Sequence, residues 1–218
     1  PIPSRGLGDV YKRQVLAKID PARTKVLRKG AFSGESVLYW MSRDKRVDDN
    51  WALLAAQSVA LNNKVPLIVC FQYLGHFPEA NIRQYGFQLK GLLELKNKLE
   101  SLNIEFILSQ GRASEVIPRI IDEKVVGTII TDYSPLRVYK KRVSKVLNRT
   151  KIPFYQIDAH NIVPVWKASP KKEYAAYTIR KKIHDNLDQF LTDYPSLIKH
   201  PHGNIRKDDI LYDNICLL

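Results

Sequence analysis

The fold of this chain is decided by residues 37–54, which read VLYWMSRDKRVDDNWALL. A short run of strand-forming residues stops at a polar, basic turn, and an apolar pattern with helical spacing follows it. In an open α/β sheet, ligands meet the loops at the carboxyl ends of the strands. The loop over residues 42–50 is therefore the first candidate site.

The overall composition indicates a globular protein with a real core. The chain has 218 residues, 44% of them hydrophobic, and no apolar run approaches the roughly 20 residues of a membrane helix. Residues 1–14 lack the apolar region of a secretory signal. The two cysteines make no disulfide framework, and Cys70, inside an apolar run, is expected to be a buried thiol. We expect a reducing setting, in the cytoplasm or, in a eukaryote, the nucleus, and no membrane association.

The charge is more informative. Thirty-five Lys and Arg against 22 Asp and Glu give a net charge of +13 and a pI of about 9.7. Such an excess favours a polyanionic partner such as nucleic acid, and a solvated basic surface explains it equally well. The five histidines and two cysteines show no zinc-type spacing, so we expect no metal site.

The periodicity predicts strands alternating with helices. Residues 1–14 look like a non-native or disordered leader, and 15–36 like an N-terminal extension. Strands are expected at 37–41, 65–71, 104–109, 125–132 and 154–158, and helices at 48–62, 81–102, 113–123 and 137–147. Residues 162–166 would extend or cap the sheet. The alternation predicts a Rossmann-like (flavodoxin-like) five-stranded parallel sheet flanked by helices, with its switch point between the first and fourth strands.

The tail changes character after residue 166. Ser169-Pro170 resembles a helix start, and an apolar stripe over 174–191 predicts a C-terminal connector helix. The pattern then dissolves, so residues 167–218 are interpreted as a connector and linker.

The candidate site residues lie at the carboxyl ends of the predicted strands. The first strand is followed by no glycine-rich phosphate turn, which argues against a dinucleotide or Walker site. Ser42, Arg43 and Arg46 could instead hold an acidic ligand, although an Arg–Asp surface pair with Asn50 near the helix cap is the favoured reading. Asp132 and Asp158 end strands at one rim and could work as acid and base, although turn capping is favoured. His160 is expected to be a hydrogen-bonded turn residue.

A second candidate feature is a basic helix that could touch phosphates. It follows the turn Tyr133-Ser134-Pro135-Leu136, and its basic residues are Arg137, Lys140, Lys141, Arg142 and Lys145. No single-strand stacking pattern accompanies them.

Several long segments of the sequence resemble segments of one known family. VLYWMSRDKR at 37–46 with DNWAL at 49–53 looks like the opening of the class II cyclobutane pyrimidine dimer photolyases. RQYGFQLKGL at 83–92, TDYSPLR at 131–137, QIDAHNIVPVW at 156–166 and ASPKKEYAAYTIRKKI at 168–183 resemble later parts of that family, in order. The resemblance covers roughly residues 14–202. At Tyr177 the sequence departs from the family pattern, which usually has arginine there.

The resemblance implies a light-driven DNA-repair flavoenzyme, a deoxyribodipyrimidine photolyase. In that family, reduced FAD held by a C-terminal helical domain donates an electron to a dimer flipped out of damaged DNA. Residues 37–166 would be the photolyase-type α/β antenna domain, and 167–218 would end before the FAD domain. On this view the chain is a fragment that is inactive alone, is monomeric and carries no catalytic residue.

The resemblance also suggests where a deazaflavin or folate antenna would bind. The rim residues that we assign to it are Ser42, Arg43, Arg46, Asp132, Tyr133, Asp158 and Asn161, and Tyr174 and Arg180 would belong to the interdomain connector. Two alternatives stay open: a cryptochrome-type photoreceptor, and a free-standing chromophore-binding module.

Overall fold

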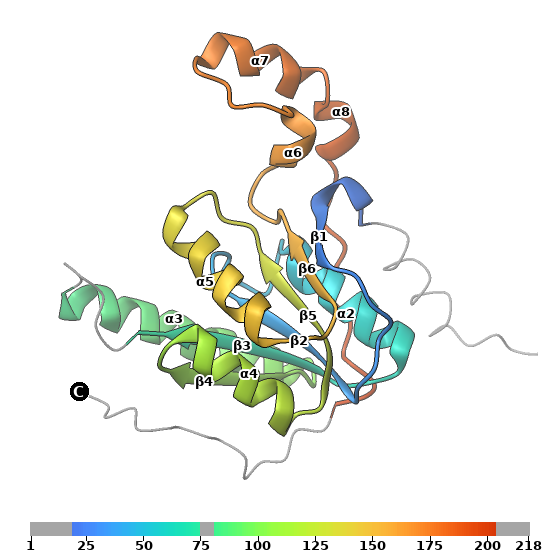
Figure 1. Cartoon of the computed structure of the whole chain (residues 1–218), viewed down its shortest axis with the longest axis vertical. Helices are drawn as coiled ribbons and strands as arrows, with labels where there is room; N and C mark the ends of the chain where they lie inside the picture. The colour runs from blue at the N-terminus through green and yellow to red at the C-terminus, as the bar shows by residue number, and fades with distance from the viewer. Residues whose placement is uncertain (1–18, 75–80, 204–218) are drawn as a thin grey trace, which may run out of the picture.

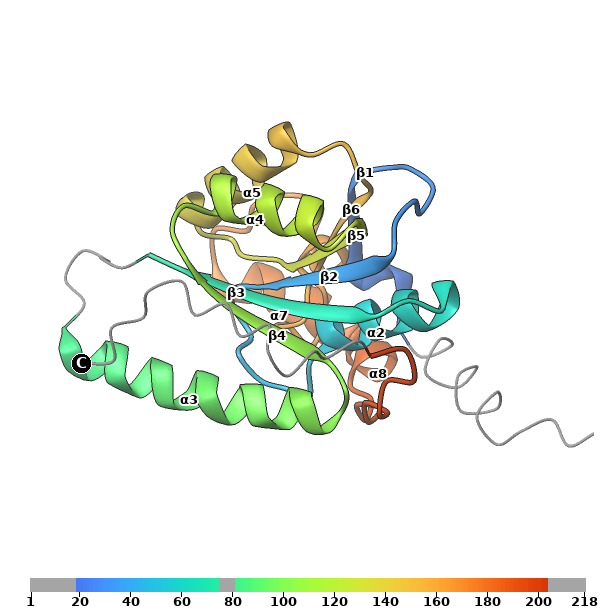
Figure 2. The same ribbon diagram turned by 90° about the horizontal axis from the view of Figure 1, so that it is seen from below.

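The computed structural model describes residues 19–74 and 81–203, which form a six-stranded sheet with helices on both faces (Figures 1 and 2). The predicted α/β class is confirmed. The predicted leader (1–14), residues 15–18 of the extension and residues 204–218 of the linker lie outside the described residues. The strands are β1 (Thr24–Arg28), β2 (Ser36–Met41), β3 (Leu67–Tyr73), β4 (Glu105–Gln110), β5 (Val126–Asp132) and β6 (Phe154–Ile157).

The helices form two layers, one on each side of the sheet. In Figure 2, α2 and α3 cover one face, and α4 and α5 cover the other. Each layer closes its own hydrophobic core cluster against the sheet, and these clusters use alternate residues of β2. The helices are η1 (Pro21–Arg23), α2 (Trp51–Asn63), α3 (Ile82–Ser101), α4 (Ala113–Glu123), α5 (Arg137–Arg149), α6 (Val165–Ala168), α7 (Ala176–His184) and α8 (Leu187–Phe190).

The strand order corrects one detail of the predicted sheet. The order β1-β6-β5-β2-β3-β4 places the five parallel strands as 3-2-1-4-5, so the expected switch point between the first and fourth of them, β2 and β5, is confirmed. The five predicted parallel strands are present, but their order is not the flavodoxin-like one, and the sheet has a sixth strand that was not predicted. The sixth strand, β1, comes from the extension and pairs antiparallel with β6, where it covers backbone groups that an edge strand would leave unpaired.

The burial of the two central strands explains why the sequence pattern located them. All six residues of β2 and all seven of β5 are buried, as expected of parallel strands covered on both faces. Cys70 in β3 is fully buried, which confirms the predicted buried thiol, and burial raises its pKa to about 12.

Helix α2 begins later than the sequence pattern predicts. Asn50 is its N-cap, and its side-chain oxygen accepts hydrogen bonds from the amides of Ala52 (3.0 Å) and Leu53 (3.1 Å). Asp49 lies just before this cap with a φ of 52°. The expected start at Asp48, with both aspartates in the first turn, is therefore wrong.

The connector beyond β6 also differs from the prediction. Residues 165–168 form the short helix α6 in place of a strand extension, and the expected single helix is divided into α7 and α8. The Ser169 hydroxyl donates to Glu173 (2.6 Å) and Glu173 accepts from Lys182 (2.5 Å), so this serine stabilises a turn, and α7 starts only at Ala176. The Asn186 amide donates to the Lys182 carbonyl (2.8 Å) at the break between α7 and α8.

After α8 the chain runs back along α2 as a return segment, residues 192–203. The Tyr194 ring centroid lies 4.7 Å from that of Trp51, and the Gln57 side chain makes two hydrogen bonds to the backbone of Ile198. The His200 amide donates to the Leu102 carbonyl (2.7 Å). The connector is therefore fixed to the α/β body at both of its ends. None of the described helices has the length and apolarity to cross a bilayer.

Two glycines provide a matched test of the close backbone packing where Gly34 meets Val125 and Gly127. A Cβ on Gly34 would lie 2.4 Å from the Gly127 amide nitrogen and 2.5 Å from the Val125 carbonyl oxygen, whereas one on Gly86, in α3, would meet nothing within 4 Å. We expect Gly34→Ala to lower the free energy of unfolding by about 1–3 kcal/mol and Gly86→Ala to raise it by about 0.5–1 kcal/mol. Urea unfolding measures both, and equal effects would contradict the close approach at Gly34.

Candidate functional site

The carboxylate of Asp132, at the end of β5, organises the candidate site. It accepts hydrogen bonds from the Tyr39 hydroxyl (2.6 Å) and from the backbone amides of Ser42 and Arg43 (2.7 Å each). The side chain is buried, and burial raises the pKa of its carboxyl, although these hydrogen bonds oppose the rise. Asp132 therefore anchors the loop that follows β2, and all of its short contacts are used within the protein.

Tyr39 and Asn50 extend the hydrogen-bond network of Asp132 beneath the backbone of loop 42–50. Burial is the main cause that raises the pKa of Tyr39 well above 10, and the negative charge of Asp132 adds to it. The phenol therefore stays protonated and donates to the carboxylate. The Asn50 side-chain amide donates to the Tyr39 hydroxyl (3.2 Å) and to the carbonyls of Asp44 and Arg46 (3.1 Å each). Loop 42–50 is thus fixed at both ends by buried polar side chains.

Asp158 does the corresponding work in the turn after β6. Its buried carboxylate accepts from the backbone and side-chain amides of Asn161 (3.2, 3.0 and 2.9 Å) and from the Val165 amide (2.8 Å). Asp158 therefore caps the turn that follows its own strand, as the favoured reading predicts, whereas Asp132 at the end of β5 holds the loop after β2. No hydrogen bond joins the two aspartates in the described structure, and each carboxylate serves as a loop anchor.

The two loops meet through Asp44 and His160. Asp44 Oδ1 lies 3.1 Å from His160 Nδ1, and the more exposed Arg46 approaches the same oxygen at 3.8 Å. His160 is therefore a hydrogen-bonded loop residue, as predicted. This contact connects the loop after β2 with the loop after β6 across the end of β5, so both belong to one rim.

The rim carries buried polar atoms whose bonding capacity is unused. Within residues 19–74 and 81–203, Arg43 Nη1, Asp44 Oδ2 and Gln72 Oε1 are buried and have no hydrogen-bond partner. Gln72 follows Phe71 in β3, and the Lys45 ammonium lies 5.2 Å from the centroid of the Phe71 ring. Buried polar groups are nearly always paired, so this donor and these two acceptors fit a ligand that has both N–H and C=O groups.

The other predicted site residues are placed as follows. Tyr133 contacts Trp166 of α6 edge to face, with the ring centroids 5.0 Å apart. Tyr174 and Arg180 are exposed on the connector, and neither hydrogen-bonds to a rim residue in the described part of the chain. The described residues hold no group of three or more His, Cys, Asp or Glu suited to a metal ion.

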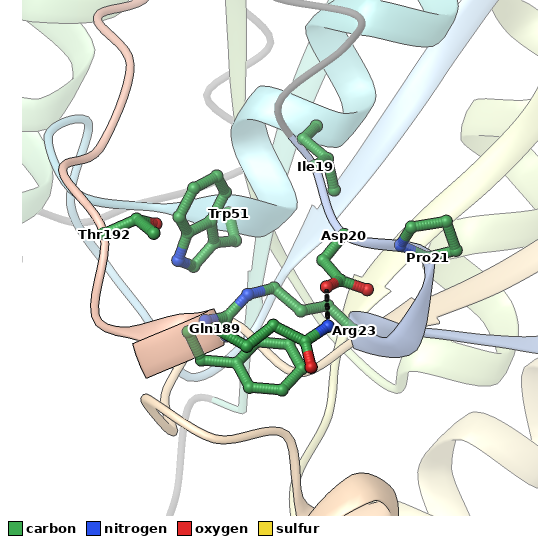
Figure 3. Close-up of a pocket in the computed structure, with 8 residues that line it drawn as sticks. Ile19, Asp20, Pro21, Arg23, Trp51, Gln189 and Thr192 are labelled. Atoms are coloured by element: carbon green, nitrogen blue, oxygen red, sulfur yellow. Dashed lines mark hydrogen bonds between the residues drawn. The ribbon is translucent and has the colours of Figure 1, made fainter. Parts of the chain in front are cut away.

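Sequence reasoning missed Arg23, which clamps the connector to the sheet. Its guanidinium donates to the carbonyls of Asp158 (3.2 Å), Asn161 (2.8 Å) and Ile162 (2.6 Å). It lies 5.0 Å from the Trp51 ring centroid and 5.4 Å from that of Phe190, beside a cavity of about 320 Å³ (Figure 3). Figure 3 also shows the Gln189 amide donating to Asp20, a hydrogen bond of 2.7 Å that links η1 and α8 beside the cavity. One arginine in a basic extension carries no local signal of such a role.

A doubly wound sheet with its polar loops at the carboxyl ends of the strands defines a Rossmann-like α/β domain. The family model described as DNA photolyase matches residues 37–201. The chain belongs to the DNA photolyase family.

Two relatives and one solved structure extend this result. The chain is 46% identical over 179 residues to a deoxyribodipyrimidine photo-lyase of Potorous tridactylus and 41% identical over 186 residues to one of Arabidopsis thaliana. These matches cover 81% and 82% of this chain but 34% and 38% of those proteins, so the chain spans little more than a third of their length. A cryptochrome from Synechocystis has the same fold, with a TM-score of 0.62 at 15% identity over 78% of this chain and 38% of that one.

The anchoring role of Asp132 can be tested with an isosteric change. Asp132→Asn removes the charge and one of the two acceptor oxygens, so either the Tyr39 hydroxyl or the amides of Ser42 and Arg43 lose their acceptor. We therefore expect the free energy of unfolding to fall by about 2–4 kcal/mol. Asp48→Asn is the control: Asp48 is exposed and forms a surface pair with Lys98 (3.2 Å), so a change below about 0.5 kcal/mol is expected. Urea unfolding that gives the same loss for both variants would refute the anchor.

Proposed function

We propose that this chain supplies the α/β domain of a class II deoxyribodipyrimidine photolyase, an FAD-dependent enzyme that splits cyclobutane pyrimidine dimers in DNA by light. The carrying observation is the 46% identity to a deoxyribodipyrimidine photo-lyase along four-fifths of the chain. The class II assignment rests on the long words shared with that class, above all residues 37–46 and 83–92. The identities to photo-lyases, 46% and 41%, exceed the 25% identity over 114 residues to a cryptochrome, so the sequence favours repair over signalling.

The geometry of the rim agrees with a domain that binds and positions rather than one that performs acid–base chemistry. Asp132 is occupied by the loop after β2 and Asp158 by the loop after β6, and the described residues of the rim form no nucleophile–base pair. In the proposed enzyme the FAD belongs to a helical domain, and we assign no flavin ligand among residues 19–203. Damaged DNA would be the substrate, handled by a monomer in the compartment that holds the DNA.

We further propose that the rim holds a deazaflavin or folate antenna. When bound, such a chromophore absorbs light and passes the excitation to the flavin. Arg43 would donate to a carbonyl group of the ring system, while Asp44 and Gln72 would accept from its N–H groups, because these atoms are buried and unpaired. Asp132, Tyr133, Asp158 and Asn161 would shape the rim, and Ser42 contributes the amide that Asp132 fixes.

A domain exchange tests the repair function. The segment of the Potorous tridactylus enzyme that aligns with residues 37–201 is replaced by this sequence, and the chimera is expressed in ultraviolet-irradiated bacteria that lack photolyase. We expect survival in blue light, and not in the dark, to rise at least tenfold over bacteria without the chimera. A folded, flavin-loaded chimera that gives no light-dependent survival would reject the proposal.

The antenna site is tested in the same chimera by binding of a deazaflavin and of a reduced folate, followed by fluorescence. Arg43→Met removes one charged donor, and a hydrogen bond to a charged group is worth about 1.5–3 kcal/mol, so affinity should fall about 10- to 100-fold. Arg83→Met is the matched control, because Arg83 is exposed on α3 and belongs to no residue set assigned to the rim, and it should change affinity less than about twofold. Equal binding by both variants would remove Arg43 from the site.

A further inference from the structure

Helix α5 concentrates the positive charge of the chain. It contains six Lys and Arg and no Asp or Glu, and with Lys151 it supplies seven of the thirteen net positive charges. The six are Arg137, Lys140, Lys141, Arg142, Lys145 and Arg149. This helix plays no part in the rim or in the connector clamp, so its charge has no role in the function proposed above.

The charges lie on one fixed, exposed face. Arg137, Lys140, Lys141 and Lys145 are exposed and stand three or four residues apart, so they share one side of the helix. On the other side Val146 is fully buried in the core cluster between α4, α5 and the sheet. Arg149 donates to the Ser114 carbonyl of α4 (3.0 Å). The packing therefore holds the basic face toward solvent.

Neighbouring acids do not neutralise this face. Two of the three α4 carboxylates pair with arginines of their own helix region, Glu115 with Arg112 and Glu123 with Arg119, at 3.8 Å each. The third, Asp122, is exposed and forms no ion pair with α5 among the described residues. Across the ranges that the structure describes, Arg137, Lys140, Lys141 and Lys145 form no ion pair. Four uncompensated cations on a rigid helix are suited to a repeating anion.

We infer that this face of α5, which we call the basic face (Arg137, Lys140, Lys141 and Lys145), binds the phosphate backbone of duplex DNA. The nine residues from Arg137 to Lys145 span about 12 Å along the helix axis. Each strand of B-DNA presents about three or four phosphates over that length. Because these side chains would contact phosphates and not base edges, the contact would be independent of sequence.

The choice of duplex DNA as the partner rests on the proposed function. An enzyme that repairs pyrimidine dimers must contact undamaged duplex before it meets a lesion. The turn before α5 contacts the connector through Tyr133 and Trp166, so the basic face starts next to the part of the fold that leads away from the sheet. In Figure 1, α5 begins on the side of the sheet that carries α6 and α7. A duplex on α5 would then extend toward the connector.

The test measures binding of the 218-residue chain to an undamaged 20-base-pair duplex in the dark, by fluorescence anisotropy across a salt series. Lys140→Gln/Lys141→Gln should weaken binding roughly tenfold at 50 mM salt and reduce the slope of log K against log salt by about two. The control, Arg83→Gln/Lys90→Gln, removes the same charge from exposed positions of α3, on the opposite face of the sheet, and should change affinity less than about twofold. Circular dichroism confirms that both variants are folded.

Equal losses in the two variants would show that net charge alone attracts DNA and would overturn the inference, as would no loss in either. A loss on anionic phospholipid vesicles without a loss on the duplex would assign the basic face to a membrane surface and also overturn it. None of these readings depends on flavin, light or repair. A chimera that fails to repair dimers while the basic face binds DNA would therefore count against the proposed function and not against this surface.

Discussion

Three short hydrogen bonds converge on the buried carboxylate of Asp132, and the shape of the functional end of the molecule follows from them. A buried charge is tolerated only where its bonding capacity is met, and here a phenol and two backbone amides meet it in place of a cation. Because two of these donors are the amides of Ser42 and Arg43, the carboxylate fixes the backbone of the loop after β2. The side chain of Arg43 is thereby left free of the internal network, with a buried nitrogen still to be paired.

This arrangement explains why strand-terminal aspartates need not be catalytic. Asp132 and Asp158 stand where a sheet of this topology collects its ligands, but both use their oxygens to hold loops. The groups available to a ligand come from the residues that those loops position. A rim of this kind selects and orients a bound molecule, and in the proposed photolyase the bond-breaking chemistry comes from the excited flavin.

Two other features, Arg23 and the basic face of α5, lie outside the rim. Arg23 hydrogen-bonds to the loop after β6 and lies 5.0 and 5.4 Å from the Trp51 and Phe190 ring centroids, so one guanidinium links the sheet, that loop and α8. The basic face lies on α5, a different layer from α2 and α3. The connector clamp, the proposed ligand contact and the proposed DNA contact therefore lie on separate parts of one small domain.

The sequence by itself determined the α/β class, the five parallel strands, the bounds of α4 and the common rim of Asp132 and Asp158, because apolar runs and helical spacing are local properties of the chain. It also determined the family, through long words such as residues 37–46. Only the tertiary structure decided that Asp132 is an anchor, since its partners at Tyr39, Ser42 and Arg43 are about 90 residues away. The same holds for β1 and Arg23: a five-residue basic strand and a lone arginine acquire their roles from an edge and a set of carbonyls more than 120 residues distant, and no local pattern encodes such partners.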